Sequence, residues 1–500
     1  MTKKGWKGNA ALIRLFQDVG RASLIVDLQD SHSGNMAVRF TDEDGAERIA
    51  ITATGSQKGD LEPSQVCFLS PDATDYGYYK ASSETDVHAG ILAQEGVRAT
   101  FHAHTKELVI ATLDDSDKPN LPPAFRPIDP LGFYHLGGEV PVDWLAVPSG
   151  SREMTQRVRE RMSDHRATIV QGHGTFSKGR TLQEAFFLAA IADRSGYLVR
   201  LCRTLGVDVE KLRLKIAADL GACFQHRPAE YTVDDDHLCD FPGETEILKE
   251  FRKAGARIFE SRLSPFHTGS ISVRGVRTML YAPKASMPRE LGGPLLEVPL
   301  ADDFPGTSAA QPGLAAAGPS DKALPANDTG LTERSANGAP PIRAGLIPPD
   351  QTGRRPDAFS GSRENDDPDL RIHRQIYARS DFQTVMHCYV AEAEAISHFV
   401  YPGEPEPVER VVPVDAEGGF LYLVIPVVTP KTGAAELVKL LHQYKVVIVR
   451  GGGVWAVGHQ SISEALHHPS SVREICLYRI GAFERGLDLR KMEPKKAKNW

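Results

Sequence analysis

Cysteine is scarce in this chain, with six residues in 500. No two of them form a Cys-x-x-Cys pair, so a thiolate zinc site is not expected. Sparse cysteine also fits a reducing compartment. The N-terminal residues 1–6 are not followed by the apolar stretch of a secretory signal. We therefore expect a cytoplasmic protein.

Long apolar runs and an excess of positive charge are also missing. No apolar run approaches the roughly 20 residues of a spanning helix, and a net charge of −7 gives no reason to expect nucleic-acid binding. With 41% hydrophobic and 25% charged residues, the composition is typical of a globular protein that is too long for one ordinary core. We expect two domains, no membrane partner and no nucleic-acid partner.

Three histidines and one glutamate stand out in the first half of the chain. His102 and His104 form a His-x-His pair in 100–111, a segment predicted to be a strand. Alternate residues of a strand face the same side, so both imidazoles reach one metal ion. His173 lies between two glycines after an apolar run, and Glu84 precedes a predicted helix. Three neutral imidazoles leave an open metal position, which favours a catalytic over a structural site.

The order Ser-Ser-Glu, then His-x-His, then His-Gly resembles the class II aldolase/adducin family. The resemblance implies an α/β fold in αβα layers, with a central, mainly antiparallel sheet flanked by helices. It also implies that His102, His104 and His173 hold one Zn²⁺, or another divalent metal, in the first domain. Glu84 would move protons and also ligate the metal before substrate arrives. A Glu84 that only caps its helix is the alternative.

The same resemblance implies a phosphate site on three loops. The matching residues are Gly34, Asn35, Thr54, Gly55, Ser82 and Ser83. Glycines allow close backbone approach and clustered N–H groups bind anions; ordinary turns are the alternative. His32 stands where the aldolases carry a small residue. Tyr134, near Gly137-Gly138, is the candidate for the acid that family aldolases take from a neighbouring subunit, with simple packing as its alternative.

The second half of the chain repeats the first. Residues 32–39 match 267–274, and 169–174 match 448–453. Two further positions, Glu84 and His102, match Asp369 and His387 with the same spacing of 18 residues. Ordered matches of this kind indicate a duplication.

The repeat also places the domains. We expect a first domain at 1–235 and a second at 244–490, with the boundary in the acidic stretch 234–243. The second copy carries an insertion near 303–366, rich in Pro, Gly, Ala and Ser. This composition does not bury enough apolar surface to offset its ordering entropy, so we expect it to be disordered.

Periodicity predicts further helices and strands. The predicted helices are 9–19, 86–95, 152–163 and 182–205. The predicted strands are 23–28, 36–40 and 47–54.

The second copy keeps His387 opposite His102 but lacks the other two metal ligands. Tyr389 stands in place of His104 and Gly452 in place of His173. We therefore expect a metal-free second domain. Family aldolases assemble as fourfold rings, so the resemblance suggests a homo-oligomer in which two tandem chains form a pseudo-fourfold ring. The second domain would then wall the active site of the first.

The residues and the resemblance together favour a zinc-dependent lyase. It would cleave a phosphorylated ketose, or a related hydroxy-keto compound, through a metal-stabilised enediolate. A dehydratase, a 4-epimerase or a decarboxylase on the same scaffold are the enzymatic alternatives, because ligand spacing does not separate them. A non-catalytic, adducin-like interaction protein is the remaining alternative.

Overall fold

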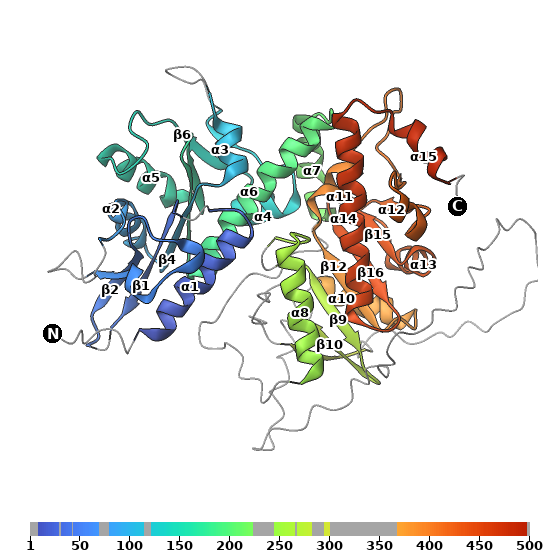
Figure 1. The fold of residues 1–500 in the computed structure, drawn as a ribbon, viewed down its shortest axis with the longest axis horizontal. Helices are drawn as coiled ribbons and strands as arrows, with labels where there is room; N and C mark the ends of the chain where they lie inside the picture. The colour runs from blue at the N-terminus through green and yellow to red at the C-terminus, as the bar shows by residue number, and fades with distance from the viewer. Residues whose placement is uncertain are drawn as a thin grey trace, which may run out of the picture.

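The computed structural model describes residues 9–29, 32–42, 44–69, 80–114, 122–223, 245–265, 268–282, 295–300 and 368–497. This part of the chain forms two eight-stranded sheets flanked by helices (Figure 1). Strand β6 pairs with β7, and β14 with β15, in parallel; the other strand pairs are antiparallel. The predicted α/β fold with mainly antiparallel sheets is confirmed.

The first domain begins with α1 and ends with α7 (Figure 1). Its strands are β1 (Asn35–Thr41), β2 (Glu47–Thr52), β3 (Val66–Leu69), β4 (Ala99–Ala103), β5 (Ala124–Phe125), β6 (Val140–Asp143), β7 (Ala167–Val170) and β8 (Gly174–Gly179). Its helices are α1 (Ala10–Ile25), α2 (Thr85–Leu92), α3 (Lys106–Thr112), α4 (Pro130–Leu136), α5 (Arg152–Asp164), α6 (Leu182–Thr204) and α7 (Val209–Cys223), with the 3₁₀ turns η1 (Lys58–Asp60) and η2 (Pro63–Gln65).

The second domain runs from α8 to α15. Its strands are β9 (Ser270–Arg274), β10 (Thr278–Ala282), β11 (Leu296–Pro299), β12 (Thr384–Cys388), β13 (Arg410–Val411), β14 (Ile425–Val428), β15 (Val446–Val449) and β16 (Gly453–Gly458). Its helices are α8 (Glu246–Glu260), α10 (Pro368–Ala378), α11 (Ala391–Ser397), α12 (Ala416–Leu421), α13 (Ala434–Tyr444), α14 (Ile462–Glu484) and α15 (Leu489–Ala497).

The duplication is confirmed by the topology of the sheets. The first sheet has the order β3-β2-β1-β4-β8-β7-β6-β5, and the second repeats it as β11-β10-β9-β12-β16-β15-β14-β13. Backbone detail is repeated too: Asp27 after α1 and Arg262 after α8 both have positive φ angles, 64° and 55°. Equivalent residues of the two domains can therefore be compared directly.

Two of the predicted elements differ from the structure. The strand predicted at 23–28 is wrong, because α1 continues to Ile25 and buries Val19, Ala22 and Ser23 on one face. The strand carrying His-x-His is also shorter than predicted. It ends at Ala103, and α3 begins at Lys106. His104 therefore lies in the connection that follows the strand.

The domain boundary at 234–243 and the insertion near 303–366 lie outside the described residues, so both stay predictions. Among the helices that the structure does describe, none is both long and apolar enough to span a membrane.

Helix α6 joins the two domains. It packs on β4 and β8 of its own sheet and on α11 of the second domain (Figure 1). At this contact, Arg194 donates to Asp129 of the first domain and to Glu394 of the second, at 3.2 and 2.9 Å. The Arg194 side chain is 8% exposed, so the interface contains a buried ionic cluster.

Candidate metal centre

The three histidines predicted as ligands come together near the end of β4. His102 lies on β4, next to β1 and β8, and His104 follows the end of β4. His173 lies in the turn between β7 and β8. One ring nitrogen from each histidine lies within 4.8 Å of the other two. This clustering suits a single metal ion bound by three imidazoles.

Two glycines let the β7–β8 turn reach the site. Gly172 has a φ of +66°, a conformation that side chains with a Cβ rarely adopt. At Gly174, a Cβ would lie 2.3 Å from the carbonyl oxygen of Ala103. The turn therefore packs directly on the end of β4. This contact brings His173 next to His104, which follows the strand.

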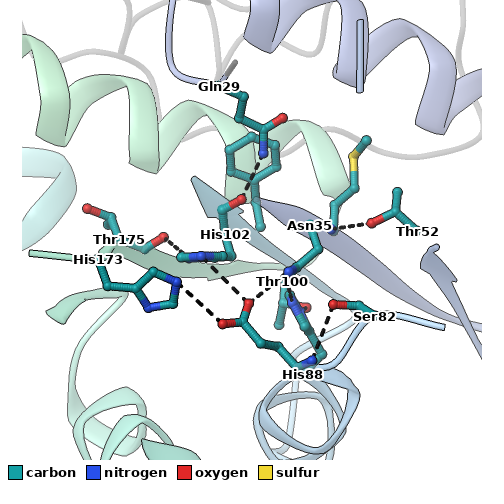
Figure 2. Close-up of polar contacts among 12 residues, drawn as sticks. Gln29, Asn35, Thr52, Ser82, His88, Thr100, His102, His173 and Thr175 are labelled. Atoms are coloured by element: carbon teal, nitrogen blue, oxygen red, sulfur yellow. Dashed lines mark hydrogen bonds and ion pairs between the residues drawn. The ribbon is translucent and has the colours of Figure 1, made fainter. Parts of the chain in front are cut away.

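Glu84 completes the group. It is the N-cap residue of α2, but its side chain makes no capping hydrogen bond. Its Oε2 lies 3.6 Å from His102 Nε2, and its Oε1 lies 3.5 Å from His173 Nε2 (Figure 2). The carboxylate is thus directed at the histidines, so the reading of Glu84 as only a helix cap is not supported.

Burial shifts the pKa values of Glu84, His102 and His173. The pKa of the Glu84 carboxyl is raised by burial, and the hydrogen bond from Asn35 partly opposes that rise. Burial lowers the pKa of His173 to about 4 and that of His102 well below its ordinary value. Both imidazoles are therefore neutral at physiological pH, as metal binding requires.

The ring of His102 is also oriented. Its Nδ1–H donates to the carbonyl oxygen of Thr175 at 3.1 Å (Figure 2), and the ring stacks on Phe176. This hydrogen bond fixes the tautomer in which Nε2 carries the free lone pair. That lone pair faces Glu84 and the other histidines.

The buried polar atoms at the centre fit a cation. Among the described residues, none makes a hydrogen bond with Glu84 Oε1 or His102 Nε2, although both atoms are buried. Buried polar atoms without partners are rare and costly. A divalent metal would satisfy both, so the residues present fit the metal that the sequence predicts.

A hydrogen-bonded relay behind Glu84 was not foreseen from the sequence. The Nδ2 of Asn35 donates to Glu84 Oε2 at 2.7 Å. The Oδ1 of Asn35 accepts from His88 Nε2, and His88 Nδ1 lies 2.6 Å from Thr100 Oγ1 (Figure 2). Burial lowers the pKa of His88 to about 3, so the ring is neutral. A neutral His88 that donates through Nε2 must accept from Thr100 through Nδ1.

The predicted phosphate loops lie beside this relay. Asn35 pairs with His102 across β1 and β4, and the Oγ of Ser82 accepts from the backbone N–H of Glu84 at 3.3 Å. Thr54 Oγ1 donates to the carbonyl oxygen of Ala81 at 2.9 Å. The remaining predicted positions, Gly34, Gly55 and Ser83, lie in the same loops. Their role in phosphate binding stays a prediction, and Asn35 has the additional role of holding Glu84.

Tyr134 lies elsewhere in the first domain. It is on α4, half-buried, with its ring against His135, and α4 packs on α6 and α7. Its predicted role as an acid in a neighbouring subunit's site stays a prediction.

A pocket of about 300 Å³ lies beside two of the ligands. Its lining residues are Ser33, His104, Lys106, Val109, Ile110, Gly172 and His173. Helix α3 therefore forms part of the pocket wall, and the pocket gives a small molecule access to His104 and His173.

The equivalent place in the second domain is filled by hydrogen bonds. His387 Nδ1 lies 2.8 Å from Asp369 Oδ2, and His387 Nε2 donates to the carbonyl oxygen of Gly452 at 2.7 Å. Both ring nitrogens thus face oxygen acceptors of the protein. This arrangement leaves His387 without a lone pair directed at a metal, and the metal-free second domain stays a prediction.

The chain belongs to the class II aldolase and adducin family. The family model described as "Class II Aldolase and Adducin N-terminal domain" matches residues 14–198 and 345–480. The two segments fall in the two halves of the chain, as the duplication requires. The predicted family is confirmed.

Several known proteins are similar to part of the chain. A 5-methylthioribulose-1-phosphate/5-deoxyribulose-1-phosphate aldolase of Rhodospirillum rubrum is 28% identical over 34% of this chain and 72% of its own length. A 3,4-dihydroxyphthalate decarboxylase of Arthrobacter keyseri is 23% identical over 42% and 79%. The crystal structure of L-fuculose-1-phosphate aldolase from Thermus thermophilus is 29% identical over 39% and 95%, with a TM-score of 0.33.

Proposed function

We propose that this chain is a metal-dependent lyase of the class II aldolase type, which cleaves a phosphorylated ketose or a related hydroxy-keto compound. The observation that carries the proposal is the buried cluster of three imidazoles, with the Nε2 of His102 lacking a hydrogen bond within the described residues and Glu84 directed at the cluster. This arrangement needs a cation and is open to a pocket on one side.

His102, His104 and His173 would hold the metal, one ion per chain. Zn²⁺ suits three imidazoles, and other divalent ions bind such sites as well. A bound metal would polarise the substrate carbonyl and stabilise the negative charge that cleavage leaves on its oxygen.

Glu84 is the proton carrier in this proposal. Cleavage breaks the bond between the carbon next to the ketone and a hydroxyl-bearing carbon. The hydroxyl loses its proton as the aldehyde forms, and the carbon next to the ketone gains one. A carboxyl group whose pKa is raised by burial is suited to both transfers near neutral pH.

The substrate class is supported by the loops and by one relative. The relative from Rhodospirillum rubrum is named as an aldolase of phosphorylated ketoses. In this chain, the segments around Asn35, Thr54 and Ser82 approach one another beside Glu84. We propose that their hydroxyl and backbone N–H groups bind the phosphate, that the enzyme works in the cytoplasm, and that it is a homo-oligomer.

A decarboxylase is the second candidate, because relatives of similar identity are named as decarboxylases of 3,4-dihydroxyphthalate and of 3-oxo-tetronate 4-phosphate. Aldol cleavage and decarboxylation both leave negative charge next to a carbonyl group, so the same metal site suits either reaction. An adducin-like scaffold is disfavoured by the buried polar atoms at the centre of the site, which need a ligand.

The test begins with metal content. The purified protein is expected to carry about one divalent ion per chain, and the His173→Ala variant is expected to lose it. The His165→Ala variant removes a histidine at the C-cap of α5 and should keep the ion. A metal-free protein after growth with added zinc would favour the adducin-like scaffold, and two ions per chain would show that the second domain binds metal.

The reaction is then identified by product. The metal-loaded protein is screened with phosphorylated ketoses for aldehyde release and with 3-oxo acids for CO₂ release. The Glu84→Gln variant should keep its metal and lose turnover by at least about 100-fold. Aldehyde release supports the lyase, whereas CO₂ release alone supports the decarboxylase.

A further inference from the structure

Lys58 is a lysine whose side chain is almost completely buried. It lies on the 3₁₀ turn η1 and is 1% exposed. Lysine is among the residues that are almost never fully buried unless they are paired, because an ammonium group taken out of water costs free energy. The groups that Lys58 contacts therefore indicate what it does.

Helix α1 fixes the backbone around Lys58. The two segments pack so closely that a Cβ at Gly20 of α1 would lie 2.1 Å from the carbonyl oxygen of Lys58. The side chain of Gln17, also on α1, donates to the carbonyl oxygen of Leu61 at 2.7 Å. The Lys58 side chain thus starts from a backbone that is held on both sides of it.

The amino group of Lys58 joins two of the three predicted phosphate loops. Its Nζ donates to the carbonyl oxygen of His32 at 3.0 Å and to that of Ser56 at 2.8 Å. His32 lies just before the predicted phosphate residues 34–35, and Ser56 follows the predicted residues 54–55. An ammonium group has three donors and no acceptor, so it suits a position between two loops that turn carbonyl oxygens toward it.

The N–H groups of the same peptides point the other way. In a planar trans peptide, the C=O group and the N–H group of the next residue lie on opposite sides. Because the carbonyl group of His32 faces Lys58, the N–H group of Ser33 is directed away from it. Ser33 lines the pocket beside two of the three metal-site histidines. A peptide that is held by Lys58 is therefore part of the pocket wall.

The two loops also contact the metal site and the third predicted loop. A Cβ at Gly34 would lie 2.5 Å from the carbonyl oxygen of His102, so the first loop packs on the strand that carries a metal ligand. Thr54 Oγ1 donates to the carbonyl oxygen of Ala81 at 2.9 Å, just before the predicted phosphate residues 82–83. Lys58 thus lies behind a connected group of loops.

The residues predicted to bind phosphate carry no charge of their own. They are glycine, asparagine, threonine and serine at positions 34, 35, 54, 55, 82 and 83. A phosphate group is strongly negative at neutral pH, and a positive charge in a poorly solvated place close to it increases its affinity.

We propose that Lys58 is the positioning residue of this anion site. It holds the loops at 32–35 and 54–57 together, and from behind them it supplies the positive charge that favours binding of the substrate phosphate. The bound anion in turn offsets the cost of burying the ammonium group. This inference rests on the proposed function, because it takes these loops as the phosphate site.

Titration of the metal-loaded full chain with inorganic phosphate, followed by calorimetry, tests the proposal. Lys58→Met should weaken phosphate binding at least about 10-fold, because a unit charge close to the loops is lost, and its metal content should equal that of the wild type. Lys211→Met removes an exposed lysine of α7 and should leave the affinity unchanged. The same titration of the His173→Ala variant separates phosphate on the loops from phosphate on the metal.

Two further variants separate the charge of Lys58 from its hydrogen bonds. Lys58→Gln keeps an N–H donor without the charge and should bind phosphate as weakly as Lys58→Met. Lys58→Arg keeps the charge and should bind phosphate at least about 10-fold more tightly than Lys58→Gln. Thermal unfolding checks that each variant folds, and Lys58→Gln against the wild type decides the question if the other two do not fold.

The outcomes distinguish this inference from the proposed reaction. Unchanged phosphate affinity in Lys58→Met, or equal affinities in Lys58→Gln and Lys58→Arg, would overturn the role of the charge. Phosphate binding that is lost in His173→Ala, or absent from the wild type, would overturn the anion site and leave a metal-dependent decarboxylase of an unphosphorylated acid standing. Phosphate binding that depends on Lys58, in a protein that cleaves no ketose, would support the anion site and count against the reaction.

Discussion

Glu84 is held by side chains from β1, α2 and β4. Thr100 donates to His88, His88 donates to the Oδ1 of Asn35, and the amide N–H of Asn35 then faces Glu84. Each hydrogen bond in this relay has only one possible donor and one possible acceptor. The relay therefore holds the Glu84 carboxylate in place before any ligand binds. Such support usually affects metal affinity or activity by about 10- to 100-fold.

Asn35→Ala should therefore slow the reaction by roughly 10- to 100-fold while the metal stays bound. The hydrogen bond from Asn35 lowers the pKa of Glu84, so its loss should move the acid limb of the pH–rate profile to higher pH. The measurement is kcat against pH for the wild type and the variant. An unchanged acid limb would show that the limb does not report on Glu84.

Buried neutral histidines should make the metal-free protein sensitive to acid. Burial lowers the pKa of His88 to about 3, whereas an unfolded chain protonates its histidines near pH 6.5. The unfolded state thus binds more protons below pH 6.5, and the free energy of unfolding should fall by about 1.4 kcal/mol per pH unit for this residue.

Urea unfolding of the metal-free protein at pH 7.5, 6.5 and 5.5 measures this fall. The free energy should be nearly flat above pH 6.5, and His88→Asn should reduce the slope below it. Equal slopes for the wild type and the variant would mean that His88 is protonated in the folded state.

The β7–β8 hairpin is a feature that the local sequence predicts, whereas other features of the first domain are not predicted. The Gly-His-Gly spacing predicted a tight turn at His173, and the structure has this turn beside His102 and His104, with glycine favoured there by the backbone geometry. The strand predicted at 23–28 failed, because α1 continues to Ile25, with Ser23 buried and Leu24 exposed on the helix. The relay through Asn35 and His88 depends on pairing between distant strands, and no local pattern reports such pairing.

Gly174→Ala should test the close approach of this hairpin. The added methyl group would lie 2.3 Å from the carbonyl oxygen of Ala103, so β8 must shift away from β4 at a cost of about 1–3 kcal/mol. Metal affinity should fall with stability, because His104 and His173 would separate. In the control Gly481→Ala, no atom lies within 4 Å of the new methyl group among the described residues, and stability should be kept or rise by up to about 1 kcal/mol.

The two domains are joined through charges that are buried at their contact. Arg194 is enclosed between Asp129, Glu394 and the carbonyl oxygen of Tyr389. Tyr197 of the same helix donates to Glu392 at 3.1 Å, and Arg473 contacts the same oxygen. Apolar residues of both domains surround this cluster in one continuous core. The spacing of residues within either copy predicts neither this buried ionic cluster nor the apolar core around it.

Arg194→Ala should weaken the coupling between the domains. It would leave the carboxylates of Asp129 and Glu394 without their shared partner, at a cost of about 3–5 kcal/mol. Calorimetry should then resolve two unfolding transitions in place of one. Arg200→Ala is the control, because its pair with Glu107 is partly exposed and should contribute less than about 1 kcal/mol. One unchanged transition in both variants would show that the apolar core alone couples the domains.

The position of α6 also bears on whether the second domain could regain a catalytic site. Tyr389 is buried against the first domain, and its carbonyl oxygen and Glu394 are occupied by Arg194. Restoring histidine at Tyr389 and Gly452 would therefore return the ligands to a site whose entrance is closed by its neighbour. The contact that joins the domains thus stands in the way of a second working site, and single substitutions at the ligand positions would not remove it.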